Sequence, residues 1–353
     1  MGFKQFSKLH LMNQSSTIIL GIESSCDDTS AAVICDGKVL ANIIANQEVH
    51  KKYGGVVPEL ASRAHQQNIV PVVDAALKEA NIKKGQLTAV AYTNGPGLLG
   101  SLLVGSSFAK SFAMGLNIPS IAINHMQGHI LAHFIDEKDE APKLKPSFPF
   151  LCLTVSGGHT QIVKVINFFE MEVIGETIDD AAGEAFDKVA KMLQLPYPGG
   201  PLVDKLAQEG NPDKFNFPHP NVGDLSFSFS GLKTSVLYFL QKEIANNSHF
   251  IEENLNDICA GVQKTIVAIL MEKIENAIKI TGIKEVAIAG GVSANSGLRS
   301  ALLQLQQKNI RVFIPKFSYC TDNAAMIAIT GYYHLKTNQP LEATMSPNAR
   351  LKL

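Results

Sequence analysis

The sequence of 353 residues contains no tryptophan, and its charges nearly cancel, with 31 Lys and Arg against 32 Asp and Glu. A net charge of −1 argues against the broad basic surface of a protein that binds nucleic acid unaided. Without Trp, the sequence also shows no aromatic platform of the kind on which single-stranded bases stack. Any contact with RNA must therefore come from local patches or from a partner protein.

Cysteines and long apolar runs are also scarce. The five cysteines are scattered, and no two of them form a C-x-x-C pair. An odd, scattered set fits a reducing cytosol rather than a disulfide framework. No apolar run looks long enough to span a bilayer, and residues 1–16 lack the apolar core of a secretory signal. We therefore expect a cytoplasmic protein without membrane contact, in which residues 1–16 form a disordered extension.

The remaining sequence divides into two halves that begin alike. Its length suggests two domains, and the polar, proline-containing segment 136–149 separates them. Residues 18–33 and 150–163 both predict a strand, a polar turn and a second strand. The Ser, Thr and Gly of both turns could point hydroxyls and backbone N–H groups at an anion. Two related halves would form a cleft for a nucleotide, although two unrelated hairpins explain the pattern as well.

Further elements follow from apolar periodicity. In the first half we expect strands at residues 17–22, 30–35, 37–44, 89–93 and 118–123, and helices at 57–80 and 98–114. In the second half, a strand near Val286 leads into Gly290-Gly291, and a helix begins near Ser296. This glycine turn has neither the G-x-G-x-x-G spacing nor a Walker lysine. It is either a close-approach site for a ligand or a simple tight turn.

Two histidines, His125 and His129, follow the strand at 118–123 with H-x-x-x-H spacing. On a helix this spacing stacks two imidazoles on one face, as a divalent metal requires. Met126 stands where a metalloprotease helix carries its general-base Glu, so the pair suggests a metal without suggesting proteolysis. Taken alone, the pair is better explained by one capping and one packed histidine.

Nine short motifs, weak singly, occur together in order. They lie at residues 21–29, 54–65, 94–98, 124–129, 155–159, 179–188, 197–201, 227–233 and 290–295. In combination they resemble the TsaD family, the tRNA adenosine threonylcarbamoyltransferases long mislabelled O-sialoglycoprotein endopeptidases. The resemblance runs from Ile18 to the C-terminus and looks bacterial.

The resemblance implies an α/β fold of the actin, sugar-kinase and heat-shock-chaperone ATPase (ASKHA) type, with two duplicated lobes around a nucleotide cleft. Residues 17–135 would form the N-terminal lobe, with a C-terminal helix at 324–345 packing back on it, and residues 150–323 the C-terminal lobe. The implied reaction moves a threonylcarbamoyl group from L-threonylcarbamoyl-AMP to N6 of adenosine 37, in tRNAs that read codons beginning with adenine. A separate synthase makes the adenylate. Bacterial members typically work with a smaller degenerate paralogue and a P-loop ATPase.

Carried over to this sequence, the family's metal, usually iron(II) and sometimes zinc, would be held by His125, His129 and Asp322. This third ligand makes a metal the better explanation of the histidine pair. The adenylate, or ATP, would contact a set of nine residues in the cleft: Thr154, Val155, Ser156, Gly157, Gly158, Asp187, Gly200, Asp204 and Asn295. Asp27 is the candidate general base, with Asp28 and Glu23 less favoured, and His159 could stabilise phosphate charge. A carboxylate that caps its own turn is the alternative for Asp27.

Candidate RNA contacts are isolated basic residues near these motifs: Lys51, Lys52, Arg63, His65, Lys233 and the 143–145 linker. Three rival functions remain. A metallopeptidase would lack its base, and a small-molecule kinase of the same superfamily would use the same cleft. The third is a scaffold subunit with a degenerate site, but the candidate catalytic, nucleotide and metal residues are all present, which argues against it.

Overall fold

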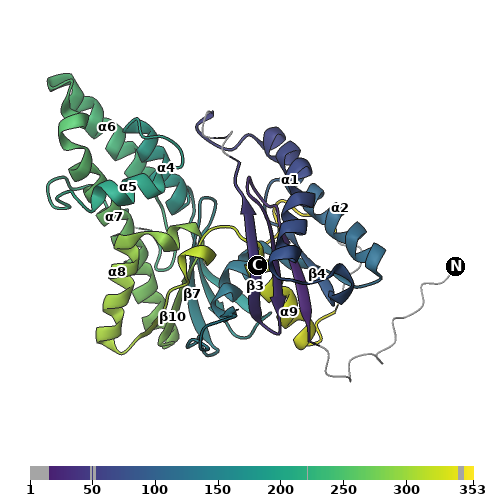
Figure 1. The fold of residues 1–353 in the computed structure, drawn as a ribbon. Coiled ribbons are helices and arrows are strands. Elements are labelled where there is room, and N and C mark those ends of the chain that lie inside the picture. Colours follow the sequence, from purple (N-terminus) through teal and green to yellow (C-terminus); the bar gives the residue numbers. More distant parts are fainter. Residues whose placement is uncertain (1–15, 48–49, 51–52, 221, 341–345) are drawn as a thin grey trace.

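The computed structural model describes residues 16–47, 50, 53–220, 222–340 and 346–353, and each half of this part of the chain is built on a mixed sheet (Figure 1). In the first sheet the strands run in the order β5-β4-β1-β2-β3-β6. They comprise β1 (Ile18–Glu23), β2 (Thr29–Cys35), β3 (Lys38–Ala45), β4 (Ala89–Gly95), β5 (Ser120–Asn124) and β6 (Asp136–Glu137). β1 is buried along its whole length because it pairs on both sides and both faces are covered by helices.

Four helices accompany the first sheet: α1 (Pro58–Glu79), α2 (Leu99–Leu116), α3 (His125–Leu131) and α9 (Ala324–Lys336). α1 and α2 pack on one face of the sheet, and α9 packs on β1 from the other. Gly21 in β1 permits this approach, because a Cβ there would overlap the carbonyl oxygen of Ala324 and lie 2.8 Å from the Cβ of Ala328. The end of the chain is thereby fixed against its first strand.

The second sheet has the order β11-β10-β7-β8-β9. Its strands are β7 (Phe150–Val155), β8 (Thr160–Val165), β9 (Met171–Glu176), β10 (Glu285–Ala289) and β11 (Arg311–Phe313). The helices of this half are α4 (Ala182–Met192), α5 (Gly200–Ala207), α6 (Ser230–Asn246), α7 (Phe250–Thr281) and α8 (Ser296–Gln304). β7 and β10 occupy the positions that β1 and β4 hold in the first sheet, each pair being parallel and flanked by an antiparallel hairpin partner.

The two-lobed α/β fold expected from the sequence is confirmed, and the predicted helix at residues 57–80 spans Pro58–Glu79. The helix expected over residues 324–345 is shorter, because it ends at Lys336 and Asn338 takes a left-handed φ of 54°. Residues 1–15 of the predicted disordered extension lie outside the described residues. Two of the candidate RNA contacts, Lys51 and Lys52, also lie outside them.

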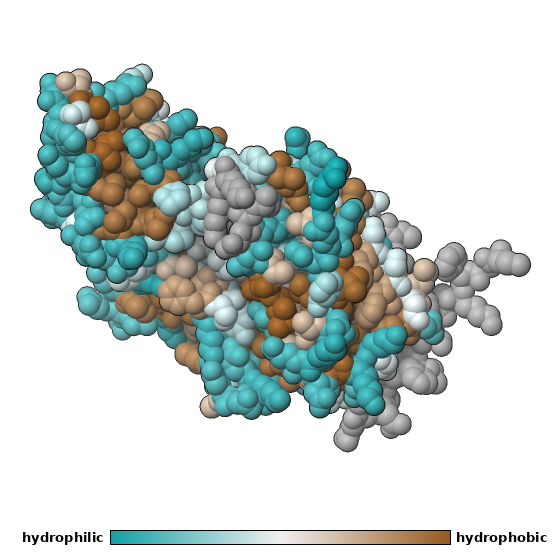
Figure 2. All heavy atoms as spheres, turned by 45° about the horizontal axis from the view of Figure 1, so that its top comes forward, coloured by the Kyte–Doolittle hydropathy of each residue, from teal (hydrophilic) through white to brown (hydrophobic). Residues whose placement is uncertain are grey.

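The expectation that no apolar run could span a bilayer needs a correction at α2. Within the described residues, α2 is one helix that is long and apolar enough to do so by length and composition alone. A core helix passes the same test, and α2 packs Leu102, Gly105 and Ala109 towards the sheet. Its outer face exposes Leu103 and Met114, and Figure 2 shows hydrophobic patches over both halves of the molecule.

We predict that Gly21→Ala destabilises the fold by about 1–3 kcal/mol, because the added methyl group forces α9 away from β1. Urea unfolding would measure the change. The matched control is Gly115→Ala in α2, where an added Cβ meets no atom within 4 Å. It should be neutral or stabilising by up to about 1 kcal/mol. Equal effects of the two substitutions would contradict the proposed steric contact.

Candidate metal centre and nucleotide cleft

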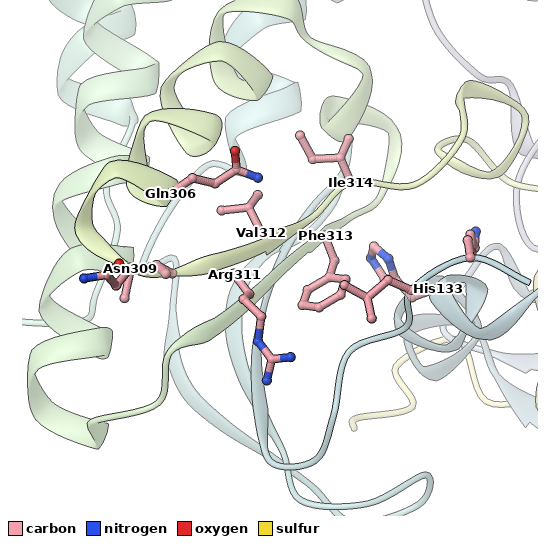
Figure 3. A pocket seen from close by; sticks show the side chains of 10 residues that line it. His133, Gln306, Asn309, Arg311, Val312, Phe313 and Ile314 are labelled. Carbon is pink, nitrogen blue, oxygen red and sulfur yellow. The ribbon is translucent and has the colours of Figure 1, made fainter.

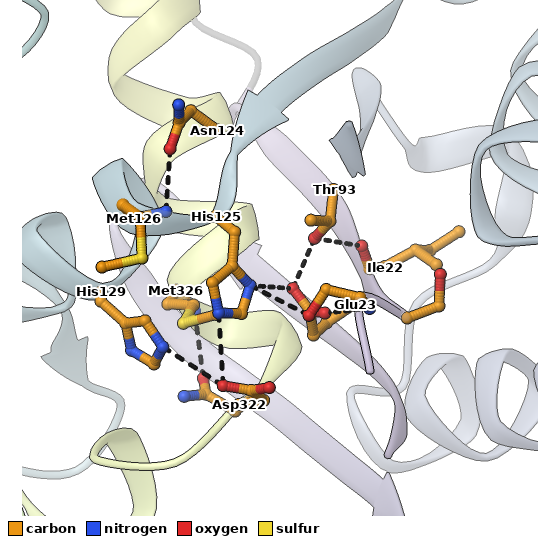
Figure 4. Close-up of polar contacts among 12 residues, drawn as sticks. Ile22, Glu23, Thr93, Asn124, His125, Met126, His129, Asp322 and Met326 are labelled. Atoms are coloured by element: carbon orange, nitrogen blue, oxygen red, sulfur yellow. Dashed lines mark hydrogen bonds and ion pairs between the residues drawn. The ribbon is translucent and has the colours of Figure 1, made fainter. Parts of the chain in front are cut away.

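His125, His129 and Asp322 come together at the starts of two helices (Figure 4). The side chain of Asn124 caps α3 by accepting hydrogen bonds from the backbone N–H groups of Met126, at 2.9 Å, and Gln127. Asn323 caps α9 in the same way. Because both caps fix where the helices begin, His125 is the first residue of α3, His129 lies one turn later, and Asp322 directly precedes the cap of α9.

The spacing of these side chains suits a cation. Asp322 Oδ1 lies 3.3 Å from His125 Nε2 and 3.2 Å from His129 Nε2. Two atoms that each lie about 2.1 Å from a metal, at roughly 90–110° to one another, are about 3.0–3.4 Å apart. Both imidazoles are buried, whereas the Asp322 side chain keeps 31% of its surface exposed. The donor set therefore fits a divalent metal, with its open side towards solvent.

Glu23 fixes the orientation of His125. This carboxylate is fully buried at the end of β1, and its Oε2 lies 3.1 Å from His125 Nδ1. Thr93 Oγ1 donates to the same oxygen, and the backbone N–H of Ser25 donates to Oε1. When Nδ1–H donates to Glu23, the ring presents its Nε2 lone pair to the cation position. The sequence had suggested Glu23 only as a minor candidate for the general base.

Burial and neighbouring charges act in opposite directions on the pKa values of the side chains at this centre. Burial alone would lower the pKa of His125, but attraction to Asp322 and Glu23 raises it well above its usual value. Burial would raise the pKa of Asp322, yet the two histidines lower it strongly. Burial lowers the pKa of His129. Without a metal, His125 therefore holds a proton that any cation bound here would have to displace, and such binding would weaken as the pH is lowered.

A cleft of about 610 Å³ lies between the two halves, and His125 and Asp322 open onto it. Seven of the predicted nucleotide contacts line it: Ser156, Gly157, Gly158, Asp187, Gly200, Asp204 and Asn295. Thr154 and Val155 do not, because both are fully buried as the last residues of β7. Asp27 is not among the lining residues, whereas its neighbour Asp28 is.

Three polar side chains that line the cleft accept hydrogen bonds from nearby backbone N–H groups. Asp187 Oδ1 accepts hydrogen bonds from the backbone N–H groups of Gly199, at 2.9 Å, and Gly200, at 3.1 Å. Asp204 accepts from both the backbone and the hydroxyl of Ser296. Asn295 accepts from the backbone N–H of Leu298 and thereby caps α8. These side chains thus fix the start of α5 and of α8 at the cleft.

The turn from β7 to β8 leaves its glycines open to a ligand. The backbone N–H of Ser156 donates to the carbonyl of His159 at 2.8 Å, which closes the turn. An added Cβ at Gly157 or Gly158 would meet no atom within 4 Å. Burial lowers the pKa of His159, and His125 and His129 lower it further, so the imidazole is neutral near pH 7. The open side of the turn can therefore admit an anionic group close to the backbone.

Comparison with known proteins settles the family. The profile of TsaD, tRNA N6-adenosine threonylcarbamoyltransferase, matches residues 38–329. The tRNA N6-adenosine threonylcarbamoyltransferase of Christiangramia forsetii is 63% identical over 342 residues, which cover 97% of this chain and 100% of that protein. The protein of the same name from Riemerella anatipestifer is 57% identical, with 97% and 99% covered. The chain belongs to the TsaD family. The resemblance found in the sequence is confirmed, and with it the expected transferase activity on tRNA.

Solved structures agree with this fold. T. kodakarensis HypF superimposes with a TM-score of 0.59 at 14% identity, covering 94% of this chain and 49% of that one. Component A of the Acidaminococcus fermentans (R)-2-hydroxyglutaryl-CoA dehydratase gives 0.53 at 17% identity, with 92% and 100% covered. At these identities the TsaD chain shares with them the ASKHA-type fold alone.

The prediction that His65 contacts RNA is wrong. It is fully buried, with Nδ1 2.7 Å from Thr29 Oγ1 and Nε2 3.0 Å from the carbonyl of Cys26, so it supports the loop after β1 instead. Arg63 is exposed and pairs with Glu59 within α1. Lys233 and Lys143 are partly buried.

A second cavity, of about 620 Å³, lies beside the edge strand β11 (Figure 3). It is lined by His133, Lys143, Arg311 and apolar residues of β11, and none of the metal or nucleotide candidates of the TsaD chain borders it. His133 is held in place, because its Nε2 lies 2.9 Å from the carbonyl of Ile288. In Figure 3 the labelled polar side chains of this cavity, Gln306, Asn309, Arg311 and His133, do not converge on one point.

We predict that Glu23→Gln weakens divalent-metal binding about 10- to 100-fold, because the amide no longer fixes the tautomer and orientation of His125. Competition with a chromogenic chelator would measure the affinity. Glu285→Gln is the matched control, since Glu285 is also a buried glutamate but pairs with Arg311 in the other sheet. Unchanged affinity in Glu23→Gln, alongside lost binding in His129→Ala, would show that Glu23 does not position the ligand.

Proposed function

We propose that the cleft binds L-threonylcarbamoyl-AMP and that the chain transfers its threonylcarbamoyl group to N6 of adenosine 37 in tRNAs that read codons beginning with adenine. The observation that carries this proposal is that two members of the metal-ligand cluster, His125 and Asp322, line the same cleft as the glycine turn at Gly157-Gly158. One end of the cleft can thus hold a nucleotide while the other holds the group to be transferred.

The donor is a mixed carbamic–phosphoric anhydride, so it is already activated and needs no covalent enzyme intermediate. In the transfer, N6 of the adenosine forms a bond to the carbamoyl carbon, the bond from this carbon to the phosphate oxygen breaks, and AMP leaves. Catalysis then consists mainly of orienting the two substrates and stabilising charge. The backbone N–H groups of Ser156 and His159 already donate within the 156–159 turn, so those of Gly157 and Gly158 are the ones suited to the phosphate. The Oδ2 atom of Asp187, whose Oδ1 accepts from Gly199 and Gly200, is suited to a ribose hydroxyl.

His125, His129 and Asp322 would hold the metal. A divalent cation bound there, iron(II) in the first place or zinc, would supply a Lewis acid that polarises a substrate carbonyl. Glu23 would keep His125 Nε2 directed at that position throughout the reaction. The partly exposed Asp322 leaves the side facing the cleft accessible to substrate oxygens.

Asp28 is a better candidate for the general base than Asp27. The N6 amine must lose a proton as it attacks, and Asp28 lines the cleft whereas Asp27 does not. Burial raises the pKa of Asp28 to about 7, and the negative charges of Asp27 and Asp322 add to this effect. A base whose pKa lies near the working pH combines sufficient ionisation with sufficient basicity.

The partners are proposed from the family resemblance. They are a smaller degenerate paralogue, a P-loop ATPase and an upstream synthase that makes the adenylate, all working in the cytoplasm. The net charge of −1 supports tRNA binding that is shared with such partners.

The decisive experiment supplies threonylcarbamoyl-AMP and unmodified tRNA to the chain, with its partner subunits, and identifies the modified nucleoside by mass spectrometry. We expect product with the wild type. His125→Ala should form none and should bind less metal, since it removes a ligand from the buried cluster. Absence of product with competent partners would refute the transfer reaction proposed here.

Asp28→Asn should lower kcat about 10²- to 10⁴-fold, which is the usual contribution of a general base. Asp27→Asn is the matched control and should cost less than about tenfold, since Asp27 is absent from the cleft lining. The reverse order of effects would return the role to Asp27.

The pH dependence offers a separate test of Asp28. Because this carboxyl must be ionised to accept a proton, the wild-type rate should fall as the pH drops below about 7. A bound cation would lower the pKa by attraction, so about 7 is the upper limit for the midpoint. Asp28→Asn should lose this acidic limb. A limb that persists in the variant would assign the titration to another group.

A further inference from the structure

One aromatic side chain stands exposed in the cleft. Phe317 lines the cleft together with Asp322, yet 66% of its surface is exposed. Among the other aromatic rings that line the described cleft, Phe186 is 2% exposed and belongs to the core, and Tyr197 is half-buried. An exposed Phe costs hydration free energy unless a ligand covers it.

The back of the Phe317 ring is covered by a fixed cation. The guanidinium carbon of Arg299 lies 4.0 Å from the ring centroid. Arg299 Nε donates to the carbonyl of Ser293 at 2.6 Å, and its Nη2 donates to the carbonyl of Pro315 at 3.1 Å. The described residues provide no carboxylate partner for this guanidinium, so it retains its charge against the ring. One face of Phe317 is thus occupied and the other is free.

The segment that carries Phe317 is held rigidly. Tyr319 is buried and donates its hydroxyl to Glu137 at 2.8 Å, while Lys316 pairs with Glu137 at 3.2 Å. Cys320 is fully buried beside Arg299. Phe317 is thus held between the ion pair of Lys316 and the buried side chains of Tyr319 and Cys320, which removes part of the entropic cost of ordering it on binding.

From this arrangement we propose that the free face of Phe317 is a stacking platform for a nucleobase bound in the cleft. Aromatic rings are the usual surfaces on which unpaired bases stack, Arg adds cation–π attraction, and stacking needs no hydrogen bonds to the base edge. This inference rests on the proposed function, because both substrates of that reaction carry bases.

Two sources can provide the base. Arg299, which backs the ring, also donates to the carbonyl of Ser293 in the turn Gly291–Ala294. Gly291, Val292 and Asn295 line the same cleft as Phe317, so the adenine of the adenylate is one source. Phe317 also lies on the segment that leads to Asp322, where the target adenosine must enter, so a base of the anticodon loop is the other. The sequence contains no Trp, and a single introduced Trp can therefore report on each source separately.

The first test is the fluorescence of Phe317→Trp, titrated with AMP and, separately, with unmodified tRNA in the presence of the partner subunits. Stacking on the indole should quench its emission. Quenching by AMP identifies the adenylate as the source, and quenching by tRNA alone identifies the RNA. Tyr238→Trp is the control, because Tyr238 on α6 is 65% exposed and lies outside the cleft lining. No quenching at position 317, or equal quenching at both positions, overturns the proposal.

The second test is kinetic. Phe317→Ala should raise KM for the substrate whose base stacks by about 5- to 150-fold, the range found for losing one base–aromatic stack. Phe317→Trp should restore the wild-type value, whereas Phe317→Leu, apolar but without a ring, should not. Wild-type KM values in Phe317→Ala, with product still formed, would overturn the platform and leave the transfer reaction intact. If the wild type formed no product, the transfer reaction would be refuted instead. The fluorescence titration would then still test whether a base stacks on Phe317.

Discussion

The packing of α9 against β1 organises the candidate site. The two elements lie at opposite ends of the chain, and they meet closely because Gly21 leaves room for the backbone at Ala324. Asp322 directly precedes α9, and Glu23 ends β1, so this one contact brings both carboxylates to His125. The candidate metal centre is thus a consequence of how α9, the last described helix, returns to β1, the first described strand.

The candidate metal centre and the nucleotide surface depend on different parts of the chain. The metal candidates come from segments that pack on the first sheet, whereas the glycine turn and the carboxylates at α5 and α8 come from the second. In the proposed reaction, neither half alone could align a carbamoyl group with a phosphate. Positioning across the cleft can supply a large share of rate enhancement, so the proposal makes the relative placement of the halves as important as any single side chain.

Much of this could be predicted from the sequence, because its signals are local. Continuous apolar runs located β1 and β7, and the H-x-x-x-H spacing correctly placed two imidazoles on one helix. The choice of His65 as an RNA contact was wrong because burial depends on packing between distant segments. His65 looked like a surface base but is buried against Thr29. Whether Asp27 or Asp28 lines the cleft depends on the same kind of packing, and the assignment of the general base stays a prediction. The contact of Glu23 with His125 could not be predicted from the sequence either, because 102 positions separate the two residues.

The Phe317 platform illustrates the same limit. Composition suggested no stacking surface because the chain lacks Trp, yet stacking requires only one exposed ring that is held flat. The Phe317 ring is held in place because Arg299 of α8 packs on it and because the contacts of Tyr319 and Cys320 anchor the segment. Each of these residues taken singly is unremarkable in sequence. The platform arises from their arrangement, and it lies on the segment that also carries Asp322, so the rigidity that orients the ring also orients a metal-ligand candidate.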